Sequence, residues 1–455
     1  MFYLARVSLG RRQPAEKSPP TCRESTQGVC LSANPKYKPE TMPTTYQPEQ
    51  FRTLYQGFKS GTVSHDRLLI GAMGGTGGQP FFSSVKERLL VLGDARQVLD
   101  KRRQYLEERW REIVALVRRS EKAGTLDELV ELHRTLNNIA LELFLRGVEV
   151  MEIHQLITTY RDRITVRVID LALEDAGPPP CPFAWFNMGS DGRGEQTFFT
   201  DQDNALVYEH ESAVVDAYFN NFARRVVKDL DTAGFALCTG NIMPTNDDWR
   251  GSLPAWQEKM EEVIGNQDQK NLLRMIILMD VVYCAGSKKV GRQFVDQVHA
   301  MIRDHFDALM SMARSAVMSS VALNFFKKFR LERSGKHAGK FNVKLFGWAP
   351  LIMTTRVFAL KYGITATNTI ARLKALEAGH HFDADLSLRL QQAYLVLTRA
   401  KMISQVEAVV SGKKYDYYLD PEVLPESERE ALKEALTAVE TLQKLAYNSF
   451  FGGML

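Results

Sequence analysis

The chain has 455 residues, of which 45% are hydrophobic, 25% charged and 10% aromatic. This composition is that of a folded protein, and it excludes a wholly disordered or collagen-like chain. Lys and Arg number 58 and Asp and Glu 54, so the net charge of +4 gives no reason to expect nucleic-acid binding. No stretch of about 18 residues is apolar and free of charge, so no membrane-spanning helix is predicted. The five cysteines are scattered without a disulfide framework or zinc spacing, which favours a reducing, cytoplasmic location.

Residues 1–82 are predicted to be a disordered leader and linker. Residues 13–50 are rich in Pro, Ser, Thr, Lys and Glu, and such a segment cannot bury enough apolar surface to fold. Residues 71–80 read GAMGGTGGQP. Because no Gly-Lys-Ser/Thr follows, this segment is interpreted as a flexible linker and not as a phosphate-binding loop. A translation start at Met42 in place of Met1 stays open.

A helical period runs through residues 83–177, where apolar residues recur at steps of three and four in three successive stretches. Gly124 ends the first stretch, and Thr125 with Glu128 forms a capping box for the second. A Gly-Pro-Pro-Pro sequence beginning at Gly177 ends the third. Three helices with short connections predict an N-terminal antiparallel bundle.

Two apolar runs, residues 183–188 and 205–208, predict neighbouring strands of a small sheet. Between them, residues 189–204 read GSDGRGEQTFFTDQDN. Glycines let a tight turn approach a ligand closely, and free N–H groups in such a turn can bind an anion. Ser190 adds a hydroxyl donor, and Arg193 adds a planar fork that suits phosphate oxygens. The turn is therefore a candidate phosphate cradle.

Asp201 and Asp203 follow this turn and are two positions apart. On an extended segment, residues at this spacing point to the same face. Two carboxylates beside a phosphate cradle form an oxygen-rich site for Mg²⁺, which can bridge nucleotide phosphates. Glycine turns and paired acids also occur separately in ordinary hairpins, where Asp caps the turn. Their combination at this spacing favours nucleotide chemistry.

This segment resembles the signature of the polymerase-β-like nucleotidyltransferase superfamily. It resembles more closely the bacterial nucleotidyltransferases that commonly accompany CBS and cyclic-nucleotide-binding modules and are relatives of the PII-protein uridylyltransferase. The resemblance is carried by Gly189, Ser190, Gly192, Arg193, Glu195, Gln196, Thr200, Asp201, Gln202, Asp203, Asn204, Ala205 and Leu206. A weaker similarity extends over roughly residues 85–445 and includes a C-terminal helical, substrate-binding region.

The resemblance implies that Asp201 and Asp203 are the catalytic residues and hold Mg²⁺ or Mn²⁺. It implies an NTP as a partner and a protein acceptor such as a PII-like regulator. The residues implied in nucleotide binding are Gly189, Ser190, Gly192, Arg193, Glu195, Gln196, Asn204, Lys344 and Arg356. Whether Glu195, Gln196 and Asn204 contact the ligand or brace the loop stays open.

The sequence departs from the family pattern in two ways. No CBS or cyclic-nucleotide-binding module is recognisable upstream of the helices. The superfamily often adds a third carboxylate from a later strand, and here Asp247, Asp248 and Asp280 are candidates without a spacing argument. Asp280 lies inside an apolar stretch and is either a paired core acid or a site residue.

The chain after the motif is predicted to be mostly helical. The expected elements are a helix over 214–230, a short strand over 235–238, a helix over 295–329 and helical segments over 350–378, 384–410 and 426–447. Basic residues cluster between positions 327 and 344, either as a solvated loop or as a binding surface for an anionic substrate.

We therefore predict an α+β protein in four parts. These are the leader and linker (1–82), the N-terminal helical bundle (83–177), a small mixed-sheet nucleotidyltransferase domain (178–300) and a C-terminal helical substrate-binding domain (301–455). The expected activity is Mg²⁺-dependent transfer of an NMP group from an NTP to an acceptor hydroxyl, with a role in signal transduction. The alternative is a catalytically silent NTP-binding regulatory module. No nucleic-acid or membrane partner is expected.

Overall fold

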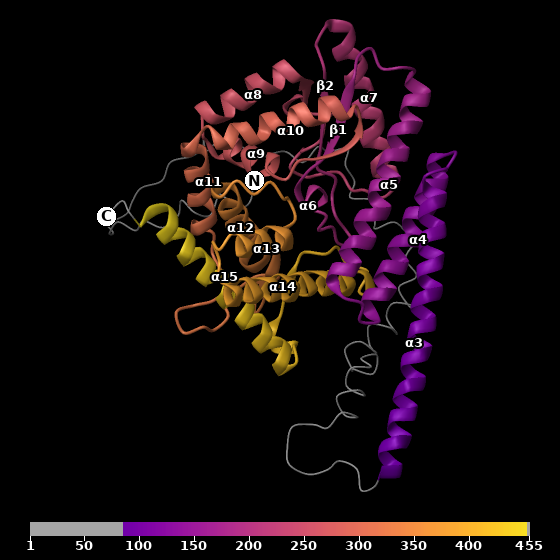
Figure 1. Ribbon diagram of the computed structural model, residues 1–455, viewed down its shortest axis with the longest axis vertical. Coiled ribbons are helices and arrows are strands. Elements are labelled where there is room, and N and C mark those ends of the chain that lie inside the picture. The colour runs from indigo at the N-terminus through magenta and orange to yellow at the C-terminus, as the bar shows by residue number, and fades with distance from the viewer. Residues whose placement is uncertain (1–84, 453–455) are drawn as a thin grey trace, which may run out of the picture.

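The computed structural model describes residues 85–452 of the chain (Figure 1). The predicted leader and linker, and both candidate start positions, lie outside the described residues. The described chain is mostly helical and contains one small mixed sheet with helices before and after it, which confirms the α+β class. Within this part of the chain, every helix is either too short or too polar to traverse a lipid bilayer.

Three helices precede the sheet, as the apolar periodicity predicted. They are α3 (Val85–Ser120), α4 (Leu126–Leu145) and α5 (Val150–Ala176). Thr125 caps α4, since its hydroxyl accepts a hydrogen bond from the Glu128 amide at 3.3 Å. The Glu128 carboxylate accepts in return from the amide of Gly124 at 3.2 Å, one residue earlier than in the standard capping box. The N-terminal part of α3 extends well beyond its two neighbours (Figure 1).

The sheet has four strands in the order β3-β2-β1-β4. Their bounds are Phe183–Asn187 (β1), Asn204–Tyr208 (β2), Arg250–Ser252 (β3) and Val282–Gly286 (β4). β1 pairs antiparallel with β2 and β4, whereas β2 and β3 are parallel. The strands predicted at 183–188 and 205–208 are confirmed. The predicted strand over 235–238 is reduced to one parallel bridge between Gln202 and Leu237.

Both faces of the two central strands are buried, and alternate residues of β1 and β2 enter different cores. Phe183, Trp185, Leu206 and Tyr208 pack with the N-terminal helices and α7 (Ala213–Thr232). The opposite face contacts α8 (Leu253–Gly265) and α10 (Lys288–Arg303) through Ala184, Phe186, Ala205 and Val207. Full burial of each large apolar side chain contributes roughly 1.5–3 kcal/mol, so the central strands are held firmly from both sides.

The remaining helices form the C-terminal part of the molecule. They are α9 (Gln269–Leu278), α11 (Phe306–Met318), α12 (Ala349–Lys361), α13 (Thr369–Ala378), α14 (Ala384–Val410) and α15 (Glu426–Phe451).

Two of the predicted long helices were wrong in extent. The helix expected over 295–329 is divided between α10 and α11 and ends at Met318. Beyond it, Leu323 and Phe329 form an isolated antiparallel bridge, so their apolar side chains enter the core from a non-helical segment. The segment 350–378 is interrupted after Lys361, where Gly363 adopts a left-handed conformation (φ +68°) that terminates α12.

Helix α14 joins the two cores. Leu390 and Leu397 belong to the C-terminal core, whereas Met402 and Val406 belong to the N-terminal core. Figure 1 shows α14 running from the C-terminal helices across to α5. Beside it lies a two-stranded ribbon of β5 (Phe341–Asn342) and β6 (Tyr418–Leu419).

Candidate active site

The glycine-rich segment after β1 forms a single helical turn, α6 (Gly189–Gly192). Gly189 enters this turn with φ +58°, in the left-handed region that favours glycine. The chain then returns beside β1, where the Met188 amide donates to the Asp203 carbonyl oxygen at 2.9 Å. The predicted tight turn is thus confirmed, and it lies next to the predicted acid pair.

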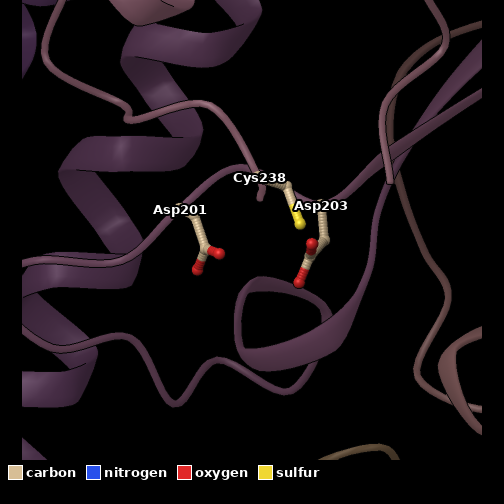
Figure 2. A group of neighbouring side chains, drawn as sticks. All are labelled: Asp201, Asp203 and Cys238. Atoms are coloured by element: carbon tan, nitrogen blue, oxygen red, sulfur yellow. The ribbon is translucent and has the colours of Figure 1, made fainter. Parts of the chain in front are cut away.

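Asp201 and Asp203 point to the same side of their segment, toward α6 (Figure 2). The intervening Gln202 points the other way and is fully buried. Its amide nitrogen Nε2 donates to the carbonyl oxygens of Phe235 at 3.0 Å and Val227 at 3.2 Å. Anchoring Gln202 in the core therefore turns both carboxylates toward the glycine turn, as the two-residue spacing predicted.

The close approach of Asp203 to the turn depends on glycine. A side chain at Gly189 would overlap the Asp203 carboxylate oxygen Oδ2. The same position needs a positive φ, so two independent constraints favour glycine there.

Cys238 completes the group, and the sequence analysis missed it. One potential ligand atom from each of Asp201, Asp203 and Cys238 lies within 4.8 Å of the others (Figure 2). Cys238 ends the segment that bridges to Gln202 through Leu237. The predicted strand over 235–238 was the available signal, but its pairing with the acidic segment is a tertiary feature.

The electrostatics of this group favour a bound cation. Burial and the neighbouring charge of Asp201 raise the pKa of Asp203 to about 7. Burial, together with the two carboxylates, also raises the pKa of the Cys238 thiol. Within the described part of the chain, Asp203 Oδ1 is buried and has no hydrogen-bond partner. These oxygen donors fit a divalent cation such as Mg²⁺, which would relieve the repulsion between the carboxylates.

Two lysines from the C-terminal half interact electrostatically with the acid pair. The half-buried Lys344 favours the ionised form of Asp203, and the charge of Asp201 acts on the buried Lys401. Among the described residues, neither ammonium group has a carboxylate within ion-pair distance. Both instead lie over the ring of Tyr417, at 5.1 Å and 5.7 Å from its centroid.

Lys401 is a second residue that the sequence analysis missed. It is 3% exposed, and burial followed by the charges of Lys344 and Arg193 lowers its pKa to about 7. The available signal was its position on α14, where it continues the buried stripe of Leu390, Tyr394 and Leu397 at steps of three and four. A lysine in an apolar stripe is a candidate site residue.

Two family models match the chain. The model described as "Putative nucleotidyltransferase DUF294" matches residues 134–270, and the model described as "Putative nucleotidyltransferase substrate binding domain" matches residues 306–450. Together they cover more than half of the sequence. The chain belongs to this nucleotidyltransferase family. No curated protein matches it. The first match contains the acid pair, the glycine turn and Cys238, whereas the second contains Lys344 and Lys401.

The resemblance to nucleotidyltransferases implied that Arg193 and Arg356 bind the nucleotide. In the structure, both side chains contact carboxylates of the protein. Arg193 donates to Glu195 at 2.8 Å and to Asp280 at 2.5 Å, and all three side chains are buried. Arg356 also binds Asp280, through Nε at 3.2 Å and through Nη2. Both guanidinium groups are thus occupied by carboxylates of the protein itself.

Asp280 is the centre of this buried network. A third arginine, Arg372, lies 3.1 Å from its Oδ1. Burial alone would raise the pKa of Asp280, but the charges of Arg356, Arg193 and Arg372 hold it well below its usual value. Of the two interpretations of Asp280, the structure supports the paired core acid.

The other two candidates for a third carboxylate of the nucleotidyltransferase centre are also engaged elsewhere. Asp247 is exposed and pairs with Arg250, while Asp248 pairs with Arg274 and Lys270. Neither belongs to the group formed by Asp201 and Asp203. The position beside those two acids is occupied by the Cys238 thiol.

Glu195 and Asn204 brace the motif. The Glu195 carboxylate accepts from Arg193 and, at 2.6 Å, from the amide of Thr369 at the start of α13. Asn204 donates to Asn187 at 3.1 Å, which ties β2 to β1.

Gln196 is buried as well, and its carbonyl oxygen lies 2.6 Å from Nδ1 of His154. Its side-chain amide has no partner within the described residues.

The contacts of Glu195 and Asn204 favour a role in bracing the loop, a question that the sequence had left open.

Proposed function

We propose that this protein transfers a nucleoside monophosphate from an NTP to an acceptor hydroxyl with the help of Mg²⁺ held by Asp201 and Asp203. The observation that carries the proposal is the arrangement of uncompensated charge. Two carboxylates and the ammonium groups of Lys344 and Lys401 are electrostatically coupled, but no ion pair joins them. A polyphosphate with its divalent cation would satisfy both sets, because the cation pairs with the acids and the phosphates with the lysines.

In the proposed reaction, the acceptor oxygen attacks the α-phosphorus and the bond to the β-phosphate oxygen breaks. Pyrophosphate leaves, and the proton of the acceptor hydroxyl passes to solvent. The bound cation would supply charge neutralisation at the phosphates. Lys344 and Lys401 would hold the polyphosphate, while Gly189 leaves room for Asp203 beside the turn and Ser190 adds a hydroxyl donor. Placement and charge account for most of the catalysis of such transfers.

Arg193 and Arg356 receive a revised role in this proposal. Their contacts with Asp280 join the glycine turn to α12, and Glu195 joins it to α13. The backbone of the turn is tied to the same region, since Thr367 donates to the Gly192 carbonyl at 2.8 Å and Asn368 donates to that of Arg193 at 3.0 Å. These residues would position the turn and would not touch the nucleotide.

The resemblance to relatives of the PII-protein uridylyltransferase leads us to propose a protein acceptor. A tyrosine hydroxyl of a PII-like regulator is the acceptor of that kind, and it would place the protein in signal transduction. Lys344 and Lys401 belong to the matched substrate-binding domain, which supports a cleft shared between the sheet and the C-terminal helices.

The experiment is transfer of radiolabel from α-labelled NTPs, with Mg²⁺ and with candidate acceptor proteins. The wild type should release pyrophosphate and label the acceptor, whereas an Asp201→Asn/Asp203→Asn variant should do neither. A Glu174→Gln/Asp175→Asn variant is the matched control, because it removes two exposed acids from α5 and should retain activity. Equal labelling by the wild type and the Asp201/Asp203 variant would contradict the proposal.

A catalytically silent NTP-binding module is the second candidate. It is favoured by the composition of the group, whose third member within the described residues is the thiol of Cys238 and not a carboxylate. Calorimetry with a non-hydrolysable NTP and Mg²⁺, run beside the transfer assay, distinguishes the two candidates. Tight binding without pyrophosphate release from a hydrolysable NTP would support the silent module.

A further inference from the structure

The backbone fixes Cys238 beside the acid pair. The Gln202 amide donates to the Ala236 carbonyl oxygen at 2.9 Å, and the Asn204 amide donates to that of Ile242 at 3.0 Å. The segment that carries Cys238 is therefore attached to the acidic segment on both sides of the thiol. This arrangement holds a sulfur donor within 4.8 Å of both carboxylates without requiring a cation to draw it there.

The other described cysteines have different surroundings. Cys181 contacts the carbonyl oxygen of His210 at 3.8 Å, and Cys284 lies on β4. Among the described residues, Cys238 is the cysteine that joins a group of three potential ligands. Its neighbour Asp203 also contributes Oδ1, a buried carboxylate oxygen without a partner in the described chain. This oxygen is a further indication that the group can accept a ligand.

We infer that Cys238 is the third donor of this cation site, so that the site binds thiophilic divalent ions such as Zn²⁺ and Cd²⁺ in competition with Mg²⁺. The inference rests on the proposed function only for placing Mg²⁺ at Asp201 and Asp203. Mg²⁺ is a hard ion that prefers oxygen ligands, and it would use the two carboxylates. Softer ions accept thiolate as well, and three protein ligands leave an open coordination position.

Coordination replaces the S–H bond of Cys238 by a bond between sulfur and the metal, and the proton is released to solvent. No oxidant or reductant takes part. A Zn²⁺ ion bound by all three side chains would occupy the position proposed for Mg²⁺. The same residues would then make the protein sensitive to thiophilic ions.

The test is titration of the full-length protein with Cd²⁺, followed by the ultraviolet charge-transfer absorption of a cadmium–thiolate bond. The wild type should show this absorption, and excess Zn²⁺ should remove it. In Cys238→Ser the absorption should vanish, and Cd²⁺ affinity measured by calorimetry should fall by more than about tenfold. This threshold is conservative, since losing a group that merely supports a metal ligand already costs about 10- to 100-fold.

Control variants test whether the cadmium–thiolate absorption comes from Cys238. Cys181→Ser and a Cys22→Ser/Cys30→Ser variant should keep the wild-type absorption. Cys238→Ser should still bind Mg²⁺ through the two carboxylates, which also shows that the site is folded. A Cys238→Asp variant should bind Mg²⁺ more tightly and Cd²⁺ more weakly than the wild type.

An unchanged absorption or Cd²⁺ affinity in Cys238→Ser would overturn the inference, as would a signal that disappears in the Cys22→Ser/Cys30→Ser variant. Such a result would leave the proposed function standing if labelled nucleotide is still transferred with Mg²⁺. Conversely, a cadmium–thiolate signal that depends on Cys238, in a protein that transfers no nucleotide, would support this inference and reject the proposed activity.

Discussion

Two clusters of opposite charges lie on either side of the glycine turn, and they are built differently. In the Asp280 network (Asp280, Arg193, Arg356 and Arg372), the carboxylate contacts each guanidinium group directly. In the cation cluster (Asp201, Asp203, Lys344 and Lys401), no ion pair joins the acids to the lysines within the described residues. Buried charges are costly unless they are paired, so the first cluster is satisfied within the protein, whereas the second has no internal ion pair and is the one that we propose binds a ligand. The paired charges of the Asp280 network stabilise the fold, whereas the charges of the cation cluster are not used in ion pairs with each other.

The two clusters share structural elements. Gly189 at one end of α6 makes room for the Asp203 carboxylate, and Gly192 at the other end makes room for the carbonyl oxygen of Asp280. The ring of Trp348 lies 5.4 Å from the Arg193 guanidinium and 4.3 Å from the Lys401 ammonium group. The Asp280 network can therefore set the position of the turn beside which the cation cluster lies.

The largest expected effect is the loss of stability on breaking the Asp280 network. Asp280→Asn leaves three buried arginines without their shared carboxylate, and it should lower the free energy of unfolding by about 3–5 kcal/mol. Urea denaturation followed by circular dichroism measures the change. Asp385→Asn breaks an exposed pair with Arg389 and should cost no more than about 1 kcal/mol. Equal losses for the two variants would remove the distinction between the clusters.

In the cation cluster, removing an acid should raise the free energy of unfolding instead of lowering it. Without metal at pH 8, Asp203→Asn should raise the free energy of unfolding by on the order of 2–4 kcal/mol, because one pKa unit corresponds to about 1.36 kcal/mol. The folded-state pKa of Asp203 is raised from 3.8 to about 7. Its protonation therefore favours folding at low pH, and this contribution is lost as pH rises through that window.

The gain from Asp203→Asn should accordingly be small near pH 4 and should grow until about pH 7. Denaturation in the presence of a chelator at several pH values measures it. Asp175→Asn on α5 is the exposed control and should show no such trend. A pH-independent difference between wild type and Asp203→Asn would show that the folded protein does not raise the pKa of Asp203.

Replacing the buried Lys401 should stabilise the ligand-free protein but weaken ligand binding. Lys401→Met should stabilise the ligand-free protein at pH 7 by about 1–4 kcal/mol, since apolar replacement of buried charge is often stabilising by that amount. The pKa of Lys401 is lowered to about 7, so the gain should increase as pH falls from about 10 toward 7.

The same replacement of Lys401 should weaken the binding of a polyphosphate. Lys401→Met should weaken calorimetric binding of Mg²⁺–tripolyphosphate by about tenfold or more, equivalent to about 1.4 kcal/mol. Lys374→Met, an exposed replacement on α13, should change neither quantity. Unchanged binding in Lys401→Met would exclude this lysine from the proposed polyphosphate site.

The two glycines of α6 should differ in what their replacement costs. Gly192→Ala would place a methyl group in severe overlap with the backbone carbonyl oxygen of Asp280, which is not free to move, and should cost about 3 kcal/mol or more. Gly189→Ala meets a movable carboxylate, although its positive φ adds a strain of roughly 1–2 kcal/mol. Thermal unfolding compares the two. Gly189→Ala should also weaken Mg²⁺ binding, because the Asp203 carboxylate must move. If a folded Gly192→Ala protein bound Mg²⁺ less well than Gly189→Ala, the assignment of Gly189 to the Mg²⁺ site would be contradicted.

The sequence was sufficient for local features whose cause is local. Apolar periodicity predicted α3, α4 and α5, and the Thr125–Glu128 pair predicted where α4 begins. The two-residue spacing of Asp201 and Asp203 predicted that both carboxylates share a face, because side chains alternate along an extended chain. The helices predicted over 384–410 and 426–447 are also confirmed as α14 and α15. The helix predicted over 295–329 was too long, since apolar residues near Leu323 and Phe329 are buried without being helical.

Partnership between distant charges was decided by the tertiary structure alone. Arg193 looks like a phosphate ligand from its neighbours in the chain, yet Asp280, 87 positions away, binds it. Cys238 and Lys401 reach the acid pair from a bridging segment and from α14, and no spacing in the sequence encodes those approaches. The chain by itself determined which groups can carry charge or bind metal. Packing determined which of those charges are neutralised internally, because the strength of an electrostatic interaction depends on distance and burial that only the fold supplies.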